Sequence, residues 1–294
     1  LNYMPGTLLE QVPLTSQLCY EIGWFAGKLD VILQGFPIKE NVLKSMSRKW
    51  NMTEIPKLRE KLHAIRSHEQ QRVAEEIIDL FESAVLFSEH KFSKGVIHGD
   101  FNDCNILVNY NNSYASRMKH DDDRHPVNIA SPGINNLFKN EETHSPDNIQ
   151  TDLSEKSKDM ILNNKTADAQ TWHVNGVIDF GDSTQSLYLF EVAIAIVHVM
   201  MNMNGIPALD AGSYVLAGYV KHINFTHIEI NHLKLCICAR FVQSLVLGYF
   251  SITQDPDNSY ILNHAQRVWP VLKSLWETSN VEVVQHLTEH VTKY

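Results

Sequence analysis

Several informative kinds of residue are scarce in this 294-residue sequence. It has four scattered cysteines, at Cys19, Cys104, Cys236 and Cys238. That is too few for the disulfide framework of a small secreted domain, so we expect reduced thiols. No uncharged apolar run reaches 18 residues, and the longest candidate, residues 187–203, contains Glu191 and His198. A membrane span is therefore not expected. Without a secretory signal pattern at the start, we expect a cytoplasmic protein.

Positive charge is also scarce. The sequence carries 25 lysines and arginines against 34 acidic residues, which gives a formal net charge of -9. Such a balance argues against a protein that binds nucleic-acid phosphates, whereas it is compatible with a cationic small-molecule partner. Apolar residues make up 44% of the chain, enough to bury a sizeable core. Nothing in the sequence indicates an oligomeric state.

Two short motifs carry the chemistry. The first is the segment 96–108, which reads VIHGDFNDCNILV and contains His98, Asp100 and Asn105. The second is the segment 176–182, which reads GVIDFGD and contains Asp179. In each motif an apolar, β-branched run precedes the HGD or DFG tripeptide and predicts a strand. Either tripeptide alone, HGD or DFG, would be an ordinary turn, but their order and context together indicate a phosphoryl-transfer site.

The residue types suit that chemistry. A hydroxyl that attacks a nucleotide γ-phosphate needs an acceptor for its proton, and a carboxylate on a rigid loop supplies one. Asp100 fits this role. Magnesium prefers oxygen ligands, so an amide and a carboxylate can hold it while phosphate oxygens and water complete its coordination. Asn105 and Asp179 fit that role.

The pattern HGDxNxxN followed by DFGD resembles the aminoglycoside phosphotransferase and choline kinase-like family. Within that family it is most similar to the hydroxylysine kinases, through segments that include YMPG (3–6), YEIGWFAGKLD (20–30), YLFEVAIAI (188–196) and RFVQSLV (240–246). The resemblance covers nearly the whole chain outside residues 109–173. It implies an α+β, protein kinase-like fold, here a mostly helical carboxy-terminal lobe with a small β-hairpin at the catalytic site.

The resemblance also implies functional assignments. The expected reaction is transfer of the γ-phosphate of GTP, with ATP as the alternative donor, to the hydroxyl of 5-hydroxy-L-lysine in lysine catabolism. Asp100 is expected to be the base, and His98 is expected to orient the loop. Residues 1–10 would form the hinge, in which Tyr3 and Met4 contact the nucleotide together with Asn105.

Other readings stay open. Asp182 and Glu191 are acidic candidates for loop support or for the substrate ammonium group. The same catalytic parts serve aminoglycoside, choline and homoserine kinases, so motifs alone do not identify the acceptor. A catalytically incomplete fragment that acts as a binding module is the alternative of a different class. It is favoured by the absence of a GxGxxG loop and a strand lysine before Leu1, because in the kinase template these cover and clamp the phosphates. We expect a fragment that lacks the amino-terminal lobe and is inactive alone.

The organisation follows from composition. Residues 11–294 are expected to form the lobe, interrupted by a polar insertion at 109–173, which holds ten asparagines and ten acidic residues. Such a segment offers little apolar area to bury, so we expect it to be disordered. If it is looped out, Val108 and Val174 become neighbours in a hairpin that brings Asn105 and Asp179 together. Apolar spacing predicts helices at 14–33, 70–92, 188–203, 210–222, 228–250, 259–278 and 281–291.

Overall fold

The computed structural model describes residues 4–35, 49–110, 171–202, 205–254 and 259–291. Its helices are α1 (Ser16–Gln34), α3 (His68–Ala84), α6 (Tyr188–Met201), α7 (Ala208–Tyr219), α8 (His227–Gln254), α9 (Ser259–Glu277) and α10 (Asn280–Thr288). Shorter 3₁₀ helices are η1 (Leu9–Gln11), η2 (Met52–Ala64), η3 (Leu86–Lys91) and η6 (Phe180–Asp182). The strands are β1 (Thr7–Leu8), β2 (Lys94–Ile97), β3 (Ile106–Tyr110), β4 (Trp172–Val177) and β5 (Thr184–Leu187).

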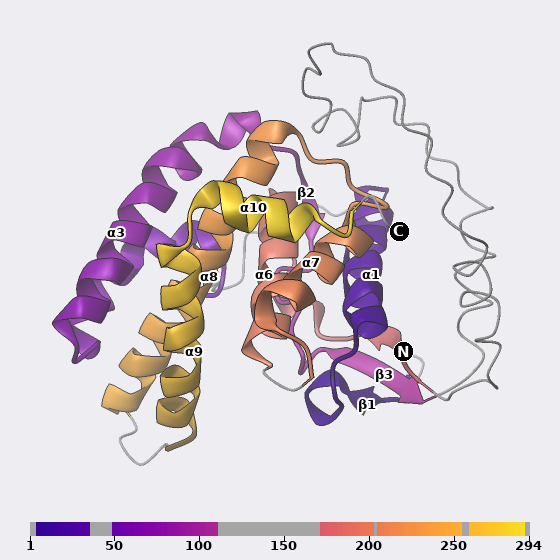
Figure 1. Ribbon diagram of the computed structural model, residues 1–294, viewed down its shortest axis with the longest axis horizontal. Coiled ribbons are helices and arrows are strands. Elements are labelled where there is room, and N and C mark those ends of the chain that lie inside the picture. Colours follow the sequence, from indigo (N-terminus) through magenta and orange to yellow (C-terminus); the bar gives the residue numbers. More distant parts are fainter. Residues whose placement is uncertain (1–3, 36–48, 111–170, 203–204, 255–258, 292–294) are drawn as a thin grey trace, which may run out of the picture.

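The core is helical, and α6 runs through its centre. Apolar residues on nearly every face of this segment predict a buried helix, and the structure confirms it, since α6 packs against α1, α7, α8 and α9 (Figure 1). Helix α1 lies especially close to α7. A Cβ added at Gly23 would lie 1.8 Å from the carbonyl oxygen of Val215, so only glycine permits this approach.

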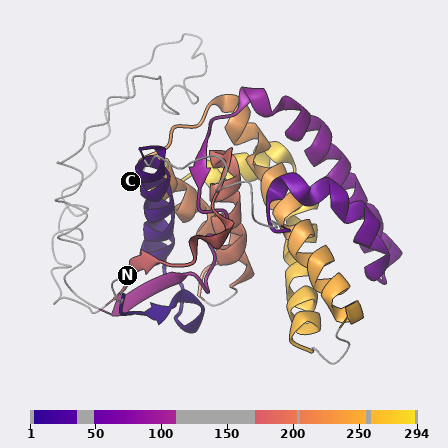
Figure 2. The same ribbon diagram turned by 180° about the vertical axis from the view of Figure 1, so that it is seen from behind.

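Two small antiparallel sheets lie beside this core. Strands β1, β3 and β4 form the first sheet in the order β1-β3-β4, and β2 pairs with β5 in the second. The first sheet lies near α1 and far from α3 and α9 in both views (Figures 1 and 2). Val108 pairs with Val174 and Ile106 with Val177, with an irregularity between Leu107 and Val108. The predicted pairing of Val108 with Val174 is therefore confirmed.

The second predicted helix is shorter than expected. The apolar spacing extended it over 70–92, but α3 ends at Ala84 and is followed by η3, which has a kink at Ser88. Ser88 has φ -110° and ψ 15°, outside helical values. Val85 and Phe92 are buried on either side of this kink. A straight helix would place these two side chains on the same face. The chain must instead turn here, because β2 lies beside β5.

The strands also continue further into the predicted insertion than its boundaries suggested. Asn109 pairs with His173, and Tyr110 pairs with Trp172. Glu21 helps to hold the extended part of β4 in place. Its buried carboxylate accepts hydrogen bonds from His173 Nδ1 at 2.7 Å and from the backbone N–H of Val174 at 3.0 Å. The rest of the segment, residues 111–170, lies outside the described residues, and its disorder stays a prediction.

Helix α8 is long and apolar enough, by length and composition alone, to cross a membrane. In the structure it packs against α3, α6, α9 and η2. It also buries Glu229, Lys234 and Arg240, each of which has polar partners in the protein. Its apolar character is thus accounted for by the protein core.

Candidate active site

The segment between β2 and β3 is the candidate catalytic loop, defined here as residues 98–105 and called the catalytic loop below. Phe101 is fully buried and anchors the loop in the core. Asn102 Oδ1 accepts hydrogen bonds from the backbone N–H groups of Cys104 at 2.9 Å and Asn105 at 3.1 Å. Side-chain turns of this kind fix loop backbones without regular secondary structure. The loop geometry is therefore set by its own sequence.

Gly99 lets the loop approach the second motif. Its φ is 80°, a left-handed value that side chains disfavour, and an added Cβ would lie 2.6 Å from the carbonyl oxygen of Asp182. The backbone N–H of Gly99 donates to Glu191 Oε2 at 2.9 Å. Because Glu191 lies in the first turn of α6, this hydrogen bond fastens the loop to the central helix.

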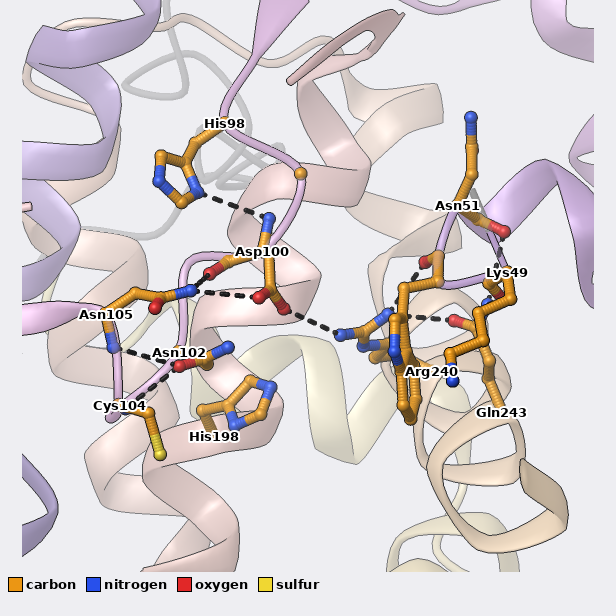
Figure 3. Close-up of polar contacts among 12 residues, drawn as sticks. Lys49, Asn51, His98, Asp100, Asn102, Cys104, Asn105, His198, Arg240 and Gln243 are labelled. Carbon is orange, nitrogen blue, oxygen red and sulfur yellow. Dashed lines mark hydrogen bonds and ion pairs between the residues drawn. The ribbon is translucent and has the colours of Figure 1, made fainter. Parts of the chain in front are cut away.

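Asp100 is held by two side chains (Figure 3). Its Oδ2 accepts a hydrogen bond from Asn105 Nδ2 at 2.9 Å, and its Oδ1 lies 3.6 Å from Arg240 Nη2. The side chain of Asp100 retains 21% exposure. Since 3.6 Å exceeds hydrogen-bond distance, Oδ1 keeps lone pairs available for a proton from a bound hydroxyl. The carboxylate is thus oriented, partly accessible and able to accept a proton.

His98 bridges the two motifs. It is buried, Nε2 lies 3.0 Å from the carbonyl oxygen of Ile178, and Nδ1 accepts from the backbone N–H of Asp100 at 3.3 Å. These two contacts suit a neutral ring with its proton on Nε2. Burial lowers the pKa of His98, although the Ile178 carbonyl and nearby carboxylates oppose the effect. The arrangement favours the predicted orienting role, because both ring nitrogens are already engaged.

Asn105 and Asp179 lie at the adjoining ends of paired strands. Asn105 precedes β3, Asp179 follows β4, and the backbone N–H of Ile178 donates to the carbonyl oxygen of Asn105 at 2.9 Å. The Nδ2 of Asn105 serves Asp100, so its Oδ1 is the atom suited to a metal. Asp179 is exposed and has a left-handed backbone with φ 61°. Such strain in a non-glycine residue is characteristic of functional sites.

The donor set fits magnesium. An amide oxygen and a carboxylate are hard ligands, and the remaining positions can be filled by phosphate oxygens and water. Within the described part of the chain no group of three histidine, cysteine or acidic side chains could hold a metal. A site that takes its other ligands from nucleotide phosphates does not need a group of three protein ligands.

The remaining predicted residues occupy different places. Glu191 is fully buried against the loop, while Asp182 is partly buried beside Gly99. These contacts favour loop support over binding of a substrate ammonium group. Met4 is 43% exposed and packs over Gly176 of β4, next to the second motif. Tyr3 lies outside the described residues.

Sequence reasoning missed Arg240, in the middle of α8. It is 2% exposed, and its Nη1 donates to the carbonyl oxygen of Trp50 and to Gln243 Oε1, both at 2.9 Å. Gln243 in turn donates to the carbonyl oxygens of Lys49 and Asn51 (Figure 3). The segment RFVQSLV was noted only as a resemblance. A buried arginine and glutamine within an apolar helix were the available signal, because buried polar groups require partners.

Replacing Arg240 should disturb Asp100 without affecting the nucleotide. Lysine at this position keeps the charge but cannot contact Trp50, Gln243 and Asp100 together. In the natural full-length protein we expect Arg240→Lys to lower kcat on the order of tenfold, because the carboxylate loses its fixed orientation, with KM for nucleotide unchanged. Steady-state kinetics tests this. Arg59→Lys, at a surface arginine that bridges Asp79 and Glu82, is the control. An equal loss in both variants would contradict the assignment.

Glu191 should make the stability of the protein depend on pH. Burial raises its pKa to about 7, while the N–H groups of Gly99 and His98 oppose the rise. The folded state therefore retains the Glu191 proton above pH 4.5, the usual value, where the unfolded state has lost it. Stability should fall between pH 4.5 and 7 by roughly 1–3 kcal/mol and then level off.

Glu191→Gln isolates this effect, since glutamine has nearly the same shape and does not titrate. Urea unfolding at pH 5 and pH 7.5 measures the free energy of unfolding of both proteins. The stability of the variant relative to the native protein should increase from pH 5 to pH 7.5. A difference that is the same at both pH values would refute the assignment.

No protein-family model matches the chain. The chain is 28% identical to hydroxylysine kinase of Bos taurus and 29% identical to that of Xenopus laevis, over all of this chain and 64% and 65% of those proteins. The chain is similar to hydroxylysine kinases throughout its length. It spans about two thirds of the length of these curated relatives. The predicted resemblance to the hydroxylysine kinases is confirmed.

Among solved structures, the chain is similar to amicoumacin kinase hAmiN, which was solved in complex with AMP-PNP, Ca²⁺ and Ami. The TM-score is 0.53 at 12% identity, over 96% of this chain and 66% of that one. At this identity the likeness shows the fold. The predicted fold class, a mostly helical kinase-like architecture with small sheets, is confirmed.

Proposed function

We propose that the protein is a small-molecule kinase that transfers the γ-phosphate of GTP to the hydroxyl of 5-hydroxy-L-lysine, in lysine catabolism. The observation that carries the proposal is the arrangement of Asp100, Asn105 and Asp179 at the junction of β2, β3 and β4. The similarity to hydroxylysine kinases supports the choice of acceptor.

Each residue of the candidate site has a separate role in the proposed reaction. Asp100 accepts the proton of the acceptor hydroxyl as that oxygen attacks, and Arg240 with Asn105 holds the carboxylate for the transfer. Asn105 and Asp179 would hold magnesium, which supplies charge neutralisation to the phosphates when bound. His98 and Glu191 keep the loop in place through Ile178 and Gly99. The proposed product is a phosphate ester of the amino acid.

The experiment is an acceptor panel. The natural full-length protein is incubated with magnesium and either GTP or ATP, and with 5-hydroxy-L-lysine, lysine, choline, 1-amino-2-propanol or kanamycin. Nucleoside diphosphate release and acceptor mass are measured. We expect phosphorylation of 5-hydroxy-L-lysine with GTP as the better donor, and none of lysine, which has no hydroxyl. A higher kcat/KM for choline or kanamycin would refute the acceptor and keep the reaction class.

A binding module is the second candidate. It predicts nucleotide binding without acceptor-dependent turnover. The retention of Asp100, Asn105 and Asp179 in hydrogen-bonding positions weighs against it, because a module that does no phosphoryl transfer has no physical need of all three.

A further inference from the structure

Asp30 lies near the end of α1 and is completely buried, yet no basic side chain in the described part of the chain pairs with it. Helices α6 and α7 both pack on α1 (Figure 1). The titratable groups that they direct toward Asp30 are Tyr219 of α7 and Tyr188 and Glu191 of α6. A buried carboxylate without a cation is costly, because its charge is no longer solvated by water. An ionised side chain is therefore an unfavourable state for Asp30.

The hydrogen bonds of Tyr219 favour a proton on Asp30. The Tyr219 hydroxyl has two oxygen neighbours, Asp30 Oδ2 and, at 3.1 Å, the carbonyl oxygen of Tyr188. A phenol carries one proton, and a carbonyl oxygen can only accept. If Asp30 were ionised, two acceptors would compete for the single proton of Tyr219. With a proton on Oδ2, Asp30 donates to Tyr219 and Tyr219 donates to Tyr188, so both contacts are hydrogen bonds.

The burial of this network agrees with its hydrogen bonds. Burial raises the pKa of Asp30 well above its usual value, and the charge of Glu191 adds to the rise, whereas the hydrogen bond with Tyr219 opposes it. Burial also raises the pKa of Tyr219, so the phenol keeps its proton. Asp30 Oδ1 has no hydrogen-bond partner among the described residues. An unpaired oxygen costs less on a neutral carboxylic acid than on a carboxylate.

Glu229 has the opposite arrangement and provides a comparison. It is also completely buried, but its Oε1 accepts from the backbone N–H of Ser93 and its Oε2 from that of Thr226, both at 2.7 Å. Two N–H donors suit an ionised carboxylate, which can only accept. The NH₂ of a glutamine at this position would face one of these donors. An amide should therefore be tolerated at Asp30 and not at Glu229.

Tyr188 connects Asp30 and Tyr219 to the catalytic loop. Tyr188 opens α6, and its ring lies against Gly95 of β2, where an added Cβ would lie 1.7 Å from Tyr188 Oη. One turn further along α6, Glu191 accepts the N–H of Gly99. The first turn of α6 thus contacts both the strand that leads into the catalytic loop and the loop itself. A shift of this turn would move Gly99 and the adjoining Asp100.

We propose that Asp30 is a positioning residue for the proposed reaction: it is held as a neutral carboxylic acid and, through Tyr219, fixes the first turn of α6, which holds the catalytic loop. The inference rests on the proposed function and deepens it. The role requires a hydrogen-bond donor at position 30 and no negative charge. Asparagine meets this requirement, because its NH₂ can donate to Tyr219 in place of the acid proton. Leucine has a similar size but cannot donate.

The first test determines the protonation state in the natural full-length protein. A protonated carboxylic acid has an infrared C=O stretching band that a carboxylate lacks. At pH 8, above the pKa of about 7 of Glu191, the native spectrum minus that of Asp30→Asn should contain this band. The native spectrum minus that of Glu229→Gln should lack it. Absence of the band for Asp30 would overturn the inference.

Thermal unfolding of the same variants gives a second reading of the protonation state. Asp30→Asn should keep the thermal midpoint within about 2 °C of the native value, because the amide replaces a neutral acid. Glu229→Gln should lower it by about 3 °C or more, because a buried N–H donor loses its acceptor. A larger loss in Asp30→Asn than in Glu229→Gln would contradict a neutral acid at position 30.

The positioning role is tested by turnover with GTP and 5-hydroxy-L-lysine. We expect Asp30→Leu and Tyr219→Phe each to lower kcat on the order of tenfold with KM for nucleotide unchanged, because the loop loses its alignment. Asp30→Asn should retain kcat within about twofold. Combining Asp30→Leu with Tyr219→Phe should cost no more than either change alone, since the two residues act through one contact. Tyr249→Phe, which removes a hydroxyl that donates to Gln70, is the control.

The outcomes separate this inference from the proposed function. Equal losses of kcat in Asp30→Asn and Asp30→Leu, or native kcat in Tyr219→Phe, would overturn the inference. If the native protein phosphorylates nothing, the proposed function fails, and hydrogen exchange of residues 96–105 decides the positioning role. Faster exchange in Tyr219→Phe, with native exchange in Asp30→Asn and Tyr249→Phe, supports it. Any other pattern of exchange refutes it.

Discussion

Asparagine in place of Asp100 should lower kcat by about 10² or more in the natural full-length protein. A general base typically contributes about 10²–10⁴ to the rate, and asparagine is nearly isosteric but cannot take the hydroxyl proton. The contact with Asn105 can be kept, so the loop should retain its geometry. Nucleotide affinity should therefore stay almost unchanged. Steady-state kinetics with 5-hydroxy-L-lysine and a direct nucleotide-binding measurement test both parts.

Asp103→Asn is a matched control on the same loop. It removes the same charge, but the Asp103 carboxylate lies 3.6 Å from His198 Nδ1, on helix α6, and its backbone carbonyl accepts from the N–H of Glu10. We expect only a small change in kcat. Normal turnover in Asp100→Asn would show that another group accepts the proton.

Alanine in place of Asp179 should give a different profile. Removing a metal ligand weakens the binding of magnesium and nucleotide together, so both affinity and kcat should fall, each by about tenfold or more. Raising the magnesium concentration should partly restore activity, because mass action compensates for a weaker site. Titration of nucleotide at several magnesium concentrations measures this. Magnesium should not rescue Asp100→Asn, and that contrast separates the two roles.

A stability measurement accompanies this variant. Asp179 is exposed, so alanine should leave the thermal midpoint within a few degrees. Magnesium-nucleotide binding of native strength in Asp179→Ala would contradict the metal assignment.

The sequence was sufficient for the motifs and for most of the helices, with the segment 70–92 as an exception. Apolar spacing alone located α6 and α8, because most of their surface is buried and few other arrangements satisfy such segments. The pairing of Val108 with Val174 could be inferred despite the long intervening segment, since two apolar strands that each end in a metal-ligand candidate share one site. Each of these inferences starts from a local apolar pattern.

Polar contacts between residues far apart in the chain could not be predicted from the sequence. Asp30 and Glu21 are polar residues of α1, yet both are buried, where they contact Tyr219 and His173 respectively. Arg240 was missed for the same reason, because its partners Trp50 and Asp100 lie far away in the sequence. Which distant group satisfies a buried charge depends on the packing of helices, and no periodicity encodes that packing.

The three-stranded sheet unites two ends of the proposed nucleotide site. Residues 4–6 lead into β1, which pairs with β3, and β3 begins immediately after Asn105. Asn175 of β4 strengthens this tie, since its Nδ2 donates to the carbonyl oxygen of Pro5 at 2.7 Å. The segment predicted to contact the base and the residues predicted to hold its metal thus flank the strands of one sheet. If Met4 contacts the base as predicted, the width of the sheet sets the distance between the base and the phosphates held near Asn105.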